Sequence, residues 1–309
     1  MVKYLIRRIL ALIPVLLGVT FVLFSLLYIT PGDPARLALG EGAPEESLNE
    51  FRREHGLDRP FLVRYAHFVY NAAVHQDIGR SYSTRRQVAS EVIRTSPATI
   101  HLAAGAMVFA TALGILFGVI CAIKQYSLFD NITMVIAILG ISIPTFYLGI
   151  LSILWFSVWL RWLPSSGFDT LSHRILPWIT LSSTSMSIIA RMTRSSMLEV
   201  IRSDYVRTAR AKGQQEYVII LKHALLNALI PIITVIGIQF GNLMGGAVLT
   251  ETVFSVSGLG RLAVDGIKSR DAPILQGVVM FIAIAYVFIN LLVDLVYAWV
   301  DPRLRTRYR

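Results

Sequence analysis

Six long runs of apolar residues constrain this chain more than any other feature. Roughly 20 consecutive apolar residues are needed for a helix to cross the hydrocarbon core of a bilayer. Six stretches meet or approach this length: residues 9–29, 97–123, 132–160, 175–189, 230–249 and 274–300. Apolar residues make up 55% of the chain and charged residues only 16%, which is typical of membrane proteins. The sequence therefore predicts an all-α membrane protein with six transmembrane helices, the fourth being short and rich in Ser and Thr.

The runs divide the chain into three parts. Residues 1–30 would form an N-terminal tail and the first span, residues 31–96 a folded extracytoplasmic region, and residues 97–309 the core transmembrane domain. Basic residues precede the first run, as in a signal peptide, but the run is too long for one and no small-residue cleavage site follows it. We therefore expect an uncleaved anchor.

Basic residues are distributed unevenly between the two sides of the expected membrane. With the N-terminus inside, most Lys and Arg residues fall in cytoplasmic segments and few in the short outer loops, so the positive-inside rule places both termini in the cytoplasm. The segment 31–96 also contains arginines, but loops beyond about 60 residues translocate largely regardless of charge. The net charge of +10 therefore reflects membrane topology, and we expect no nucleic acid partner.

The segment 191–231 is the one long polar interruption between the later runs. Asp204 can cap the stretch YVRTARAK, and Gly213 follows it where a helix C-terminus favours a residue with positive φ. The next stretch has apolar residues at the spacing of an amphipathic helix, namely Tyr217, Ile220, Leu221, Ala224 and Leu225. These patterns predict two short helices hinged at a glycine, on a loop that docks a partner.

Polar residues and a proline inside the runs are candidates for a transport pathway. The amides of Gln239 and Asn242 would be costly against lipid, and we favour pathway lining over a hydrogen bond between helices. Ser183 belongs to a hydroxyl-rich stretch that supports a pore only weakly, because such hydroxyls can bond carbonyls of their own helix. Pro144 breaks the third run, where a kink beside a pathway and a purely structural bend are equally consistent.

Small residues recur at every fourth position in two of the runs. In the second run they are Ala106, Ala110, Gly114, Gly118 and Ala122, and in the fifth they are Gly237, Gly241 and Gly245. Small residues in this register allow helix backbones to approach closely. We therefore expect these positions to pack against neighbouring helices.

Constellations of catalytic residues are missing from the sequence. The six histidines have no metal-ligand spacing, Cys121 is the only cysteine, and there is no GxSxG elbow or GxxxxGK[ST] phosphate loop. The sequence thus predicts a non-catalytic subunit without a metal or other cofactor of its own. A self-contained channel or secondary transporter is the main alternative, although ionisable residues for ion coupling are scarce in the runs. A membrane-anchored scaffold with residues 31–96 as a receptor is the third.

Several motifs resemble those of the transmembrane subunits of ABC importers, specifically the dipeptide/oligopeptide permease family that includes nickel and glutathione members. They are DYVRTARAKG at 204–213 with HALLNALIP at 223–231, GDPA at 32–35, GLDRP at 56–60, DIGRS at 77–81, ETVFSVSGLG at 251–260 and RDAP at 270–273. Against the general importer signature of the loop, Ala209, Gly213 and Leu225 match. Four positions depart from it and instead fit the version of the peptide-permease subgroup: Arg207, Thr208, His223 and Leu226.

The resemblance implies an inner-membrane permease that works with other chains. These would be a second, homologous permease chain, two cytoplasmic ATPases that hold ATP and Mg²⁺, and an extracytoplasmic solute-binding protein. Contact with an ATPase would be made by Asp204, Arg207, Thr208, Ala209, Lys212, Gly213, Gln214, His223 and Leu225. The substrate would be a short peptide, although a longer peptide, glutathione or a nickel chelate fits the sequence equally well. Residues 31–96 would either cover the outer mouth of this chain or dock the binding protein.

Overall fold

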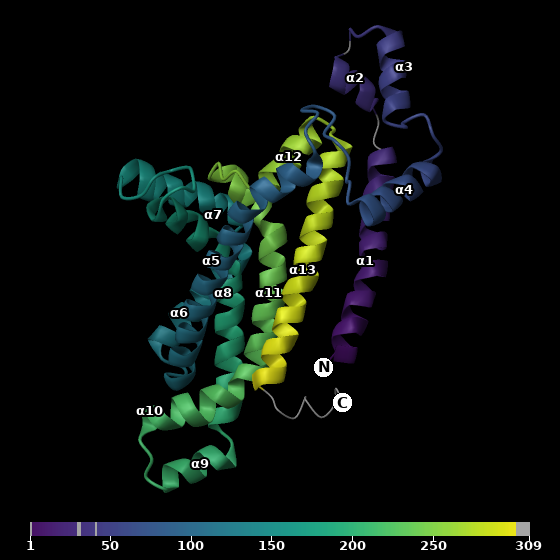
Figure 1. Ribbon diagram of the computed structural model, residues 1–309. Coiled ribbons are helices and arrows are strands. Elements are labelled where there is room, and N and C mark those ends of the chain that lie inside the picture. The colour runs from purple at the N-terminus through teal and green to yellow at the C-terminus, as the bar shows by residue number, and fades with distance from the viewer. Residues whose placement is uncertain (1, 30–31, 41, 301–309) are drawn as a thin grey trace. The chain divides into compact units, whose positions relative to one another are not determined.

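The structure is a computed structural model that describes residues 2–29, 32–40 and 42–300 (Figure 1). The arginine-rich end of the chain used in the topology argument, residues 301–309, lies outside the described part. Within the described part the chain is helical except for turns and one isolated β-bridge between Arg80 and Gln87. The helices form two compact units. Unit 1 consists of residues 1–98 and 257–287, and unit 2 of residues 99–256 and 288–309.

Unit 1 contains the N-terminal helices together with α12. Its elements are α1 (Val2–Ile29), α2 (Pro34–Leu39), α3 (Glu45–Glu54), α4 (Phe61–Tyr70), the π-helix η1 (Asn71–His75) and α12 (Leu259–Lys268), together with the beginnings of α5 (Val88–Ile123) and α13 (Ala272–Val300). The expected folding of the region after the first run is thus confirmed. It contains three α-helices of its own before α5.

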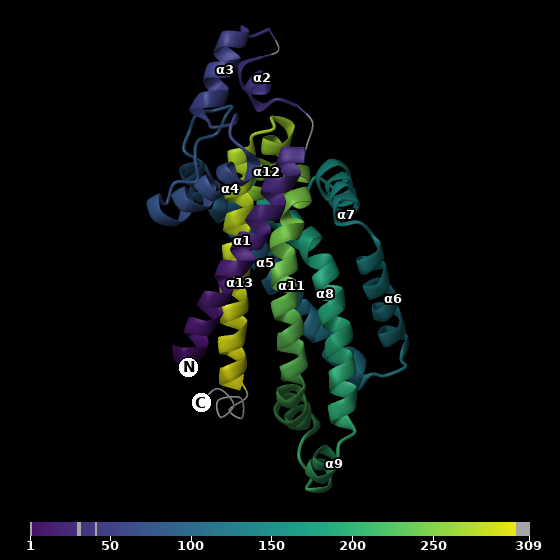
Figure 2. The ribbon, with the colours of Figure 1, turned by 90° about the vertical axis from the view of Figure 1, so that its right-hand side faces the viewer.

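Unit 2 is built around α8. It contains the remainder of α5 and α13 together with α6 (Leu128–Ser142), α7 (Thr145–Ser152), the π-helix η2 (Ile153–Trp159), α8 (Leu171–Ile201), α9 (Asp204–Ala211), α10 (Glu216–Val218), the π-helix η3 (Ile219–Leu225) and α11 (Leu226–Val253). Helix α8 packs against α6, α7 and α11, and Figure 2 shows it beside α11.

Small residues of α5 meet α8 at short distances, as the spacing predicts. A side chain added at Gly114 would lie 2.8 Å from Cγ2 of Ile189, and one at Gly118 would lie 2.5 Å from Cβ of Thr193. Ala106 and Ala110 of the same stripe are fully buried. Larger residues at these positions would force the two helices apart, so the stripe serves packing.

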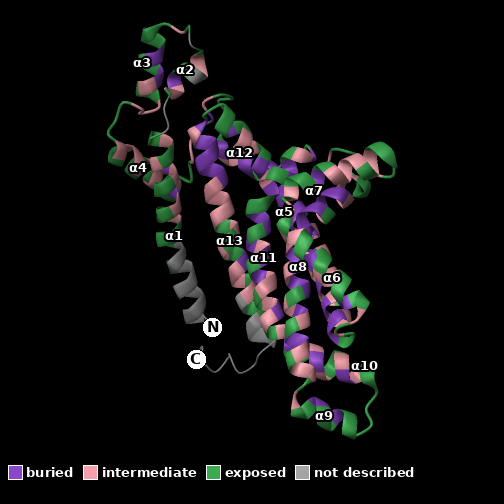
Figure 3. Ribbon diagram, turned by 180° about the vertical axis from the view of Figure 1, so that it is seen from behind, coloured by how far each residue is buried: buried purple, intermediate pink, exposed green. Residues whose placement is uncertain are grey.

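Helix α8 buries its polar side chains inside unit 2. Ser182, Ser183 and Ser187 are all buried, and Figure 3 shows buried segments along α8. Each hydroxyl donates to a carbonyl three or four residues earlier in the same helix, which satisfies these groups without a partner from another helix. The fourth run can therefore contain many hydroxyl groups, because these side chains face protein and are hydrogen-bonded within their own helix.

The third apolar run is broken at Pro144, as the sequence predicts. The run 132–160 is divided between α6 and the helical pair α7–η2, whose axes differ by 108°. Ile143 is extended, with φ −79° and ψ 124°, and Pro144 precedes α7. Proline has no N–H to donate and restricts the preceding residue to extended conformations, so the helix ends there. The structure has a sharp break where a kink was expected.

Fewer helices have the length and composition of a membrane span than the sequence predicts. Among the described residues these are Val88–Ile123, Glu216–Val253 and Ala272–Val293, with a fourth if the bent pair counts as one. Helix α1 has 28 residues, of which Ile13–Ile29 count as a shorter apolar helix. The 31-residue α8 is long enough, but its hydroxyl groups lower its hydropathy. The structure therefore shows an all-helical protein with several membrane-length helices.

A buried ion pair ties α6 to α8 within unit 2. Arg194 donates from Nε to Oδ1 and from a terminal guanidinium nitrogen to Oδ2 of Asp130, both at 2.7 Å. Asp130 is 1% exposed and also accepts a hydrogen bond from the backbone N–H of Tyr126 at 2.9 Å. This bidentate geometry is the strongest form of an arginine–carboxylate pair.

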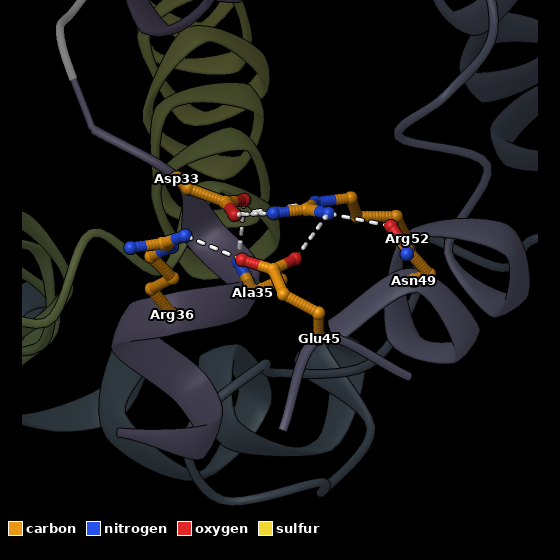
Figure 4. Close-up of polar contacts among 6 residues, drawn as sticks. All are labelled: Asp33, Ala35, Arg36, Glu45, Asn49 and Arg52. Carbon is orange, nitrogen blue, oxygen red and sulfur yellow. Dashed lines mark hydrogen bonds and ion pairs between the residues drawn. The ribbon is translucent and has the colours of Figure 1, made fainter. Parts of the chain in front are cut away.

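A second ion pair closes the α2–α3 hairpin of unit 1 (Figure 4). Asp33 caps α2 by accepting a hydrogen bond from the N–H of Ala35 at 3.0 Å, and it also accepts two hydrogen bonds from Arg52 of α3. Beneath this pair, Ala35, Leu48 and Phe51 form a buried apolar cluster. Burial, the largest influence, raises the pKa of Asp33, but Arg52, the Ala35 N–H and Arg36 together hold the pKa below its ordinary value.

Three of the sequence motifs meet in unit 1. Asp271, from RDAP, is buried and accepts hydrogen bonds from the hydroxyls of Ser81 and Ser83, of which Ser81 ends DIGRS. A side chain at Gly32, from GDPA, would overlap the guanidinium of Arg270. These motifs therefore fix the turn before α13 against the segments that precede α2 and α5.

Replacing Arg194 with methionine should destabilise the protein by about 3–5 kcal/mol, because Asp130 would remain buried without its counter-charge. Urea denaturation of the purified protein in detergent measures this. The control is Arg191→Met, an exposed arginine on the same helix, which should change stability by no more than about 0.5 kcal/mol. Adding Asp130→Asn to Arg194→Met should recover much of the loss. Similar losses for the two arginine variants would contradict this role of the pair.

The α2–α3 hairpin should loosen in acid. Because the folded pKa of Asp33 is lowered, the stability from the pair is fully present above the ordinary aspartate pKa of about 3.9 and is lost as the pH falls through the lower folded value. Hydrogen exchange of residues 34–54, corrected for its intrinsic pH dependence, should therefore accelerate below about pH 3.9. In the Asp33→Asn variant, exchange should already be faster at neutral pH and should not show this transition. Parallel profiles for the two proteins would refute the assignment.

Candidate functional site

The candidate site is the turn between α8 and α11, which lies at one end of unit 2 (Figure 1). Helix α8 ends at Ile201, and Ser203 has the extended conformation of an N-cap residue, with φ −71° and ψ 153°. Asp204 is already in the first turn of α9. The prediction that Asp204 caps this helix is therefore wrong by one residue, although its carboxylate still complements the positive end of the helix dipole.

Gly213 has the backbone conformation that the sequence predicts. Helix α9 ends at Ala211, Lys212 is its C-cap residue, and Gly213 follows with φ +75°. A side chain added at Gly213 would meet no atom within 4 Å. The glycine is therefore required by the backbone conformation of the turn and not by lack of space.

The periodicity predicts a second, separate short helix in the loop. The structure does not contain one. From Glu216 the chain is helical through α10 and η3 directly into α11. A π-helix has more residues per turn than an α-helix, so the face calculated with α-helical spacing is displaced. Of the expected positions, Ala224 is buried, but Tyr217 and Leu221 are 64% and 55% exposed, whereas Ile219, which is not in the predicted pattern, is buried.

Three sets of contacts hold the two arms of the turn together. Val206 and Ala209 of α9 pack against Ile219 of η3 in a buried cluster. Arg210 pairs with Glu216 across Gly213, with a guanidinium nitrogen 2.6 Å from Oε1. His223 lies 2.8 Å, through Nε2, from Oε1 of Gln214. The two arms of the turn are therefore joined by apolar, ionic and hydrogen-bond contacts into one closed structure.

The predicted coupling residues divide into an exposed set and a packed set. Ala209 is buried in the cluster, and His223 and Leu225 are half-buried. The others are exposed, namely Asp204, Arg207, Thr208, Lys212, Gly213 and Gln214. Of these, Arg207 lies 3.8 Å from the carboxylate of Asp204, while Thr208 donates to the backbone carbonyl of Asp204. The exposed surface is therefore polar, with two cations, and is available to a partner.

The predicted pathway residues are only partly brought together. Asn242 is exposed and donates from Nδ2 to Oε1 of buried Gln239 at 2.9 Å, within α11. Ser183 bonds the carbonyl of Thr180 in its own helix. Pro144 is exposed at the break between α6 and α7. Within the described part of the chain, no hydrogen bond joins Ser183 or Pro144 to the two amides.

Sequence reasoning missed the charged residues that stabilise the loop. Arg210 and Glu216 are six residues apart, a spacing that no helical rule pairs, because the turn at Gly213 intervenes. The pair Asp130 and Arg194 anchors α8 a short distance before the loop, and its only sequence signal is an acid near the start of the third apolar run. These residues position the site and are not part of its exposed surface.

Comparison with known families agrees with this architecture. Residues 114–306 match the family described as "Binding-protein-dependent transport system inner membrane component", and residues 1–103 match the N-terminal family of such membrane components. The chain therefore belongs to the inner-membrane permease subunits of binding-protein-dependent ABC transporters. It is a multi-pass, non-catalytic transport component that works with a binding protein and an ATPase.

Relatives that match the chain over its full length identify the subgroup of the family to which it belongs. The chain is 43% identical over 333 residues to the dipeptide transport system permease protein DppB of Alkalihalophilus pseudofirmus, covering 99% of this chain and 100% of the relative. It is 42% identical over 305 residues to the glutathione transport system permease protein GsiC of Escherichia coli, covering 99% of each. The chain is thus a member of the dipeptide/glutathione permease family, and the resemblance inferred from its motifs is confirmed.

A solved structure shares the fold. The MetNI methionine ABC transporter in an inward-facing conformation aligns with a TM-score of 0.58, covering 68% of this chain and 96% of that chain at 21% identity. At this identity the similarity concerns the fold alone. It supports the helical arrangement described above for the transport domain.

Proposed function

We propose that the chain forms one half of the translocation pathway of an importer for short peptides, and that a second, homologous permease chain forms the other half. Two cytoplasmic ATPases with ATP and Mg²⁺ and an extracytoplasmic binding protein complete the assembly. The full-length similarity to a dipeptide permease and a glutathione permease supports this substrate class. Both relatives carry solutes with peptide-type bonds and carboxylates, which favours a small peptide over a metal chelate.

The closed turn around Gly213 is the observation on which the coupling role rests. Its exposed residues project from one end of unit 2, while Ala209, Val206 and Ile219 hold it together from within. Arg207 and Lys212 give the exposed surface a positive charge that suits acidic groups or helix C-termini on a partner. We infer that this turn inserts into a groove of an ATPase, so that closure of the ATPases displaces it as a rigid body.

Membrane topology follows from this role. If the turn contacts a cytoplasmic ATPase, both termini lie in the cytoplasm and residues 31–96 lie outside, provided that α1, the bent pair and α8 each cross the membrane. The buried hydroxyls of α8 are bonded within the helix, which makes a polar helix compatible with a place among other spans. A six-span arrangement therefore remains our proposal.

Gln239 and Asn242 are the strongest candidates for lining the pathway. Asn242 is exposed and holds the side chain of Gln239 through a hydrogen bond, so the two amides form one polar patch on α11. Ser183 points its hydroxyl at its own helix and contributes less. Pro144 is exposed at the break in the third run, where free backbone groups require water or a neighbouring chain.

Uptake of a dipeptide into proteoliposomes should require ATP, the ATPases and the binding protein. The rate of uptake should also depend on the backbone conformation of Gly213. We expect Gly213→Val to impair uptake, because a β-branched residue at positive φ is strained by about 1–2 kcal/mol, roughly a 5- to 30-fold change in the population of the native turn. Membrane insertion, measured by the amount of chain in the membrane fraction, should be unchanged.

Gly213→Asn is the matched control, since asparagine tolerates the left-handed conformation and the site has room for a side chain. It should retain most of the uptake. Full ATP-dependent uptake with valine would remove the coupling assignment. Uptake driven by an ion gradient without ATP would instead overturn the importer itself.

Replacing Gln239 or Asn242 with leucine should lower uptake more than the same change at Thr234. Thr234 is exposed on the same helix and bonds only the carbonyl of Ile230, so Thr234→Leu alters polarity without touching the amide patch. The measurement is the initial rate of dipeptide uptake at equal ATPase activity. Equal effects at the three positions would show that the amides serve packing and not passage of substrate.

A further inference from the structure

Unit 1 contains a cavity of about 560 Å³, within the size range of sites for small molecules. One wall is apolar and comes from Phe24, Leu27 and Tyr28 at the end of α1 and from Phe68 of α4. The remaining walls come from the start of α2, the end of α3 with the turn after it, polar residues of α4, the segment 77–82 and the first residues of α13. The cavity is therefore amphipathic, with an apolar side at the end of an apolar helix.

Arginines dominate the polar walls. The cavity is lined by Arg52, Arg53, Arg59, Arg64 and Arg80. Arg52 is paired with Asp33, but in the described part of the chain the other four make no ion pair. They outnumber the two remaining acids of the lining, Glu54 and Asp77. Several cations around one cavity repel each other unless an anion is present, so the lining favours an anionic ligand.

Arg64 places a cation directly beside the apolar wall. Its guanidinium lies 5.6 Å from the ring centre of Phe24 and 5.8 Å from that of Tyr28, both within the range of cation–π attraction. The side chain is half-buried. A ligand that reaches Arg64 must therefore bring its negative charge next to apolar surface, as an amphiphile does.

The apolar wall continues along α1 outside the cavity. Leu10, Leu17 and Phe21, on the side of α1 that carries the lining residues, are 57%, 40% and 41% exposed. Helix α4 is fixed to α1 here, since the hydroxyl of Tyr65 donates to the carbonyl of Leu17 at 2.8 Å. An exposed apolar stripe that leads to a basic cavity provides surface for hydrocarbon chains and for a charged headgroup on one ligand.

We propose that this cavity binds the phosphodiester headgroup of an anionic phospholipid. Arg59 and Arg64 contact the phosphate, Arg53 and Arg80 add positive charge, and the acyl chains lie on the exposed side of α1. A free phosphate would use the arginines but not the apolar stripe. The inference does not depend on the peptide substrate or on the coupling turn, because it requires only that the protein lies in a membrane.

The test measures binding of short-chain phosphatidylglycerol to the purified full-length protein by native mass spectrometry. Each arginine near a headgroup contributes about 1 kcal/mol, or roughly five-fold in affinity, so R59Q/R64Q should bind on the order of 25-fold more weakly. The matched control is R86Q. Arg86 is exposed, lies outside the cavity lining and pairs with Glu91, which Arg94 also contacts, so this variant should bind like the unaltered protein.

Further variants and ligands distinguish the effects of side-chain charge, of misfolding and of headgroup type on lipid binding. R59K/R64K keeps both charges and should retain most of the binding. If R59Q/R64Q does not fold, the single variants R64Q and R80Q carry the test, each with an expected loss of roughly five-fold. Zwitterionic phosphatidylcholine should bind more weakly than phosphatidylglycerol. Equal binding by the unaltered protein and the glutamine variants, or displacement of the lipid by equimolar inorganic phosphate, would overturn the proposal.

Discussion

Close contact between the backbones of α5 and α8 is the constraint on which unit 2 depends. Gly114 and Gly118 leave room for Ile189 and Thr193 of α8 at distances that no side chain at the glycines would permit. Because α8 is enclosed in this way, its serines can lie inside the protein and bond carbonyls of their own helix. A helix that hydropathy alone would not assign to a membrane thus becomes the centre of the helical unit.

The same helix carries the candidate site. Only two residues separate the end of α8 from the start of α9, and the ion pair between Asp130 and Arg194 ties this part of α8 to α6. The other arm of the turn runs without interruption into α11, which packs on α8. Under the proposed function, a displacement of the turn would therefore reach three packed helices together, because no flexible linker lies between the turn and either helix.

Local rules predicted the parts of this structure that local forces decide. Apolar runs gave the helices, the four-residue spacing of small residues gave the α5 contact, and glycine after a basic last turn gave the positive φ at Gly213. Two motifs that are distant in sequence are joined by a hydrogen bond between the side chains of Ser81 and Asp271. The π-helical stretch η3 and the ion pair between Arg210 and Glu216 depend on contacts between elements, and helical periodicity contains no information about them. Pro144 predicted the position of the break in the third run but not its angle of 108°.

Two parts of the small-residue stripe on α11 differ in a way that bears on the proposed pathway. Gly237 lies against Val293, where an added side chain would come within 2.6 Å, but a side chain at Gly245 would meet no atom within 4 Å. Asn242, between them, is exposed and holds the amide of Gln239. One part of the small-residue stripe is thus covered within the chain, whereas the part beside the amides is not. Under the proposed function, this part of α11 borders the pathway, and the second, homologous chain supplies the wall opposite it.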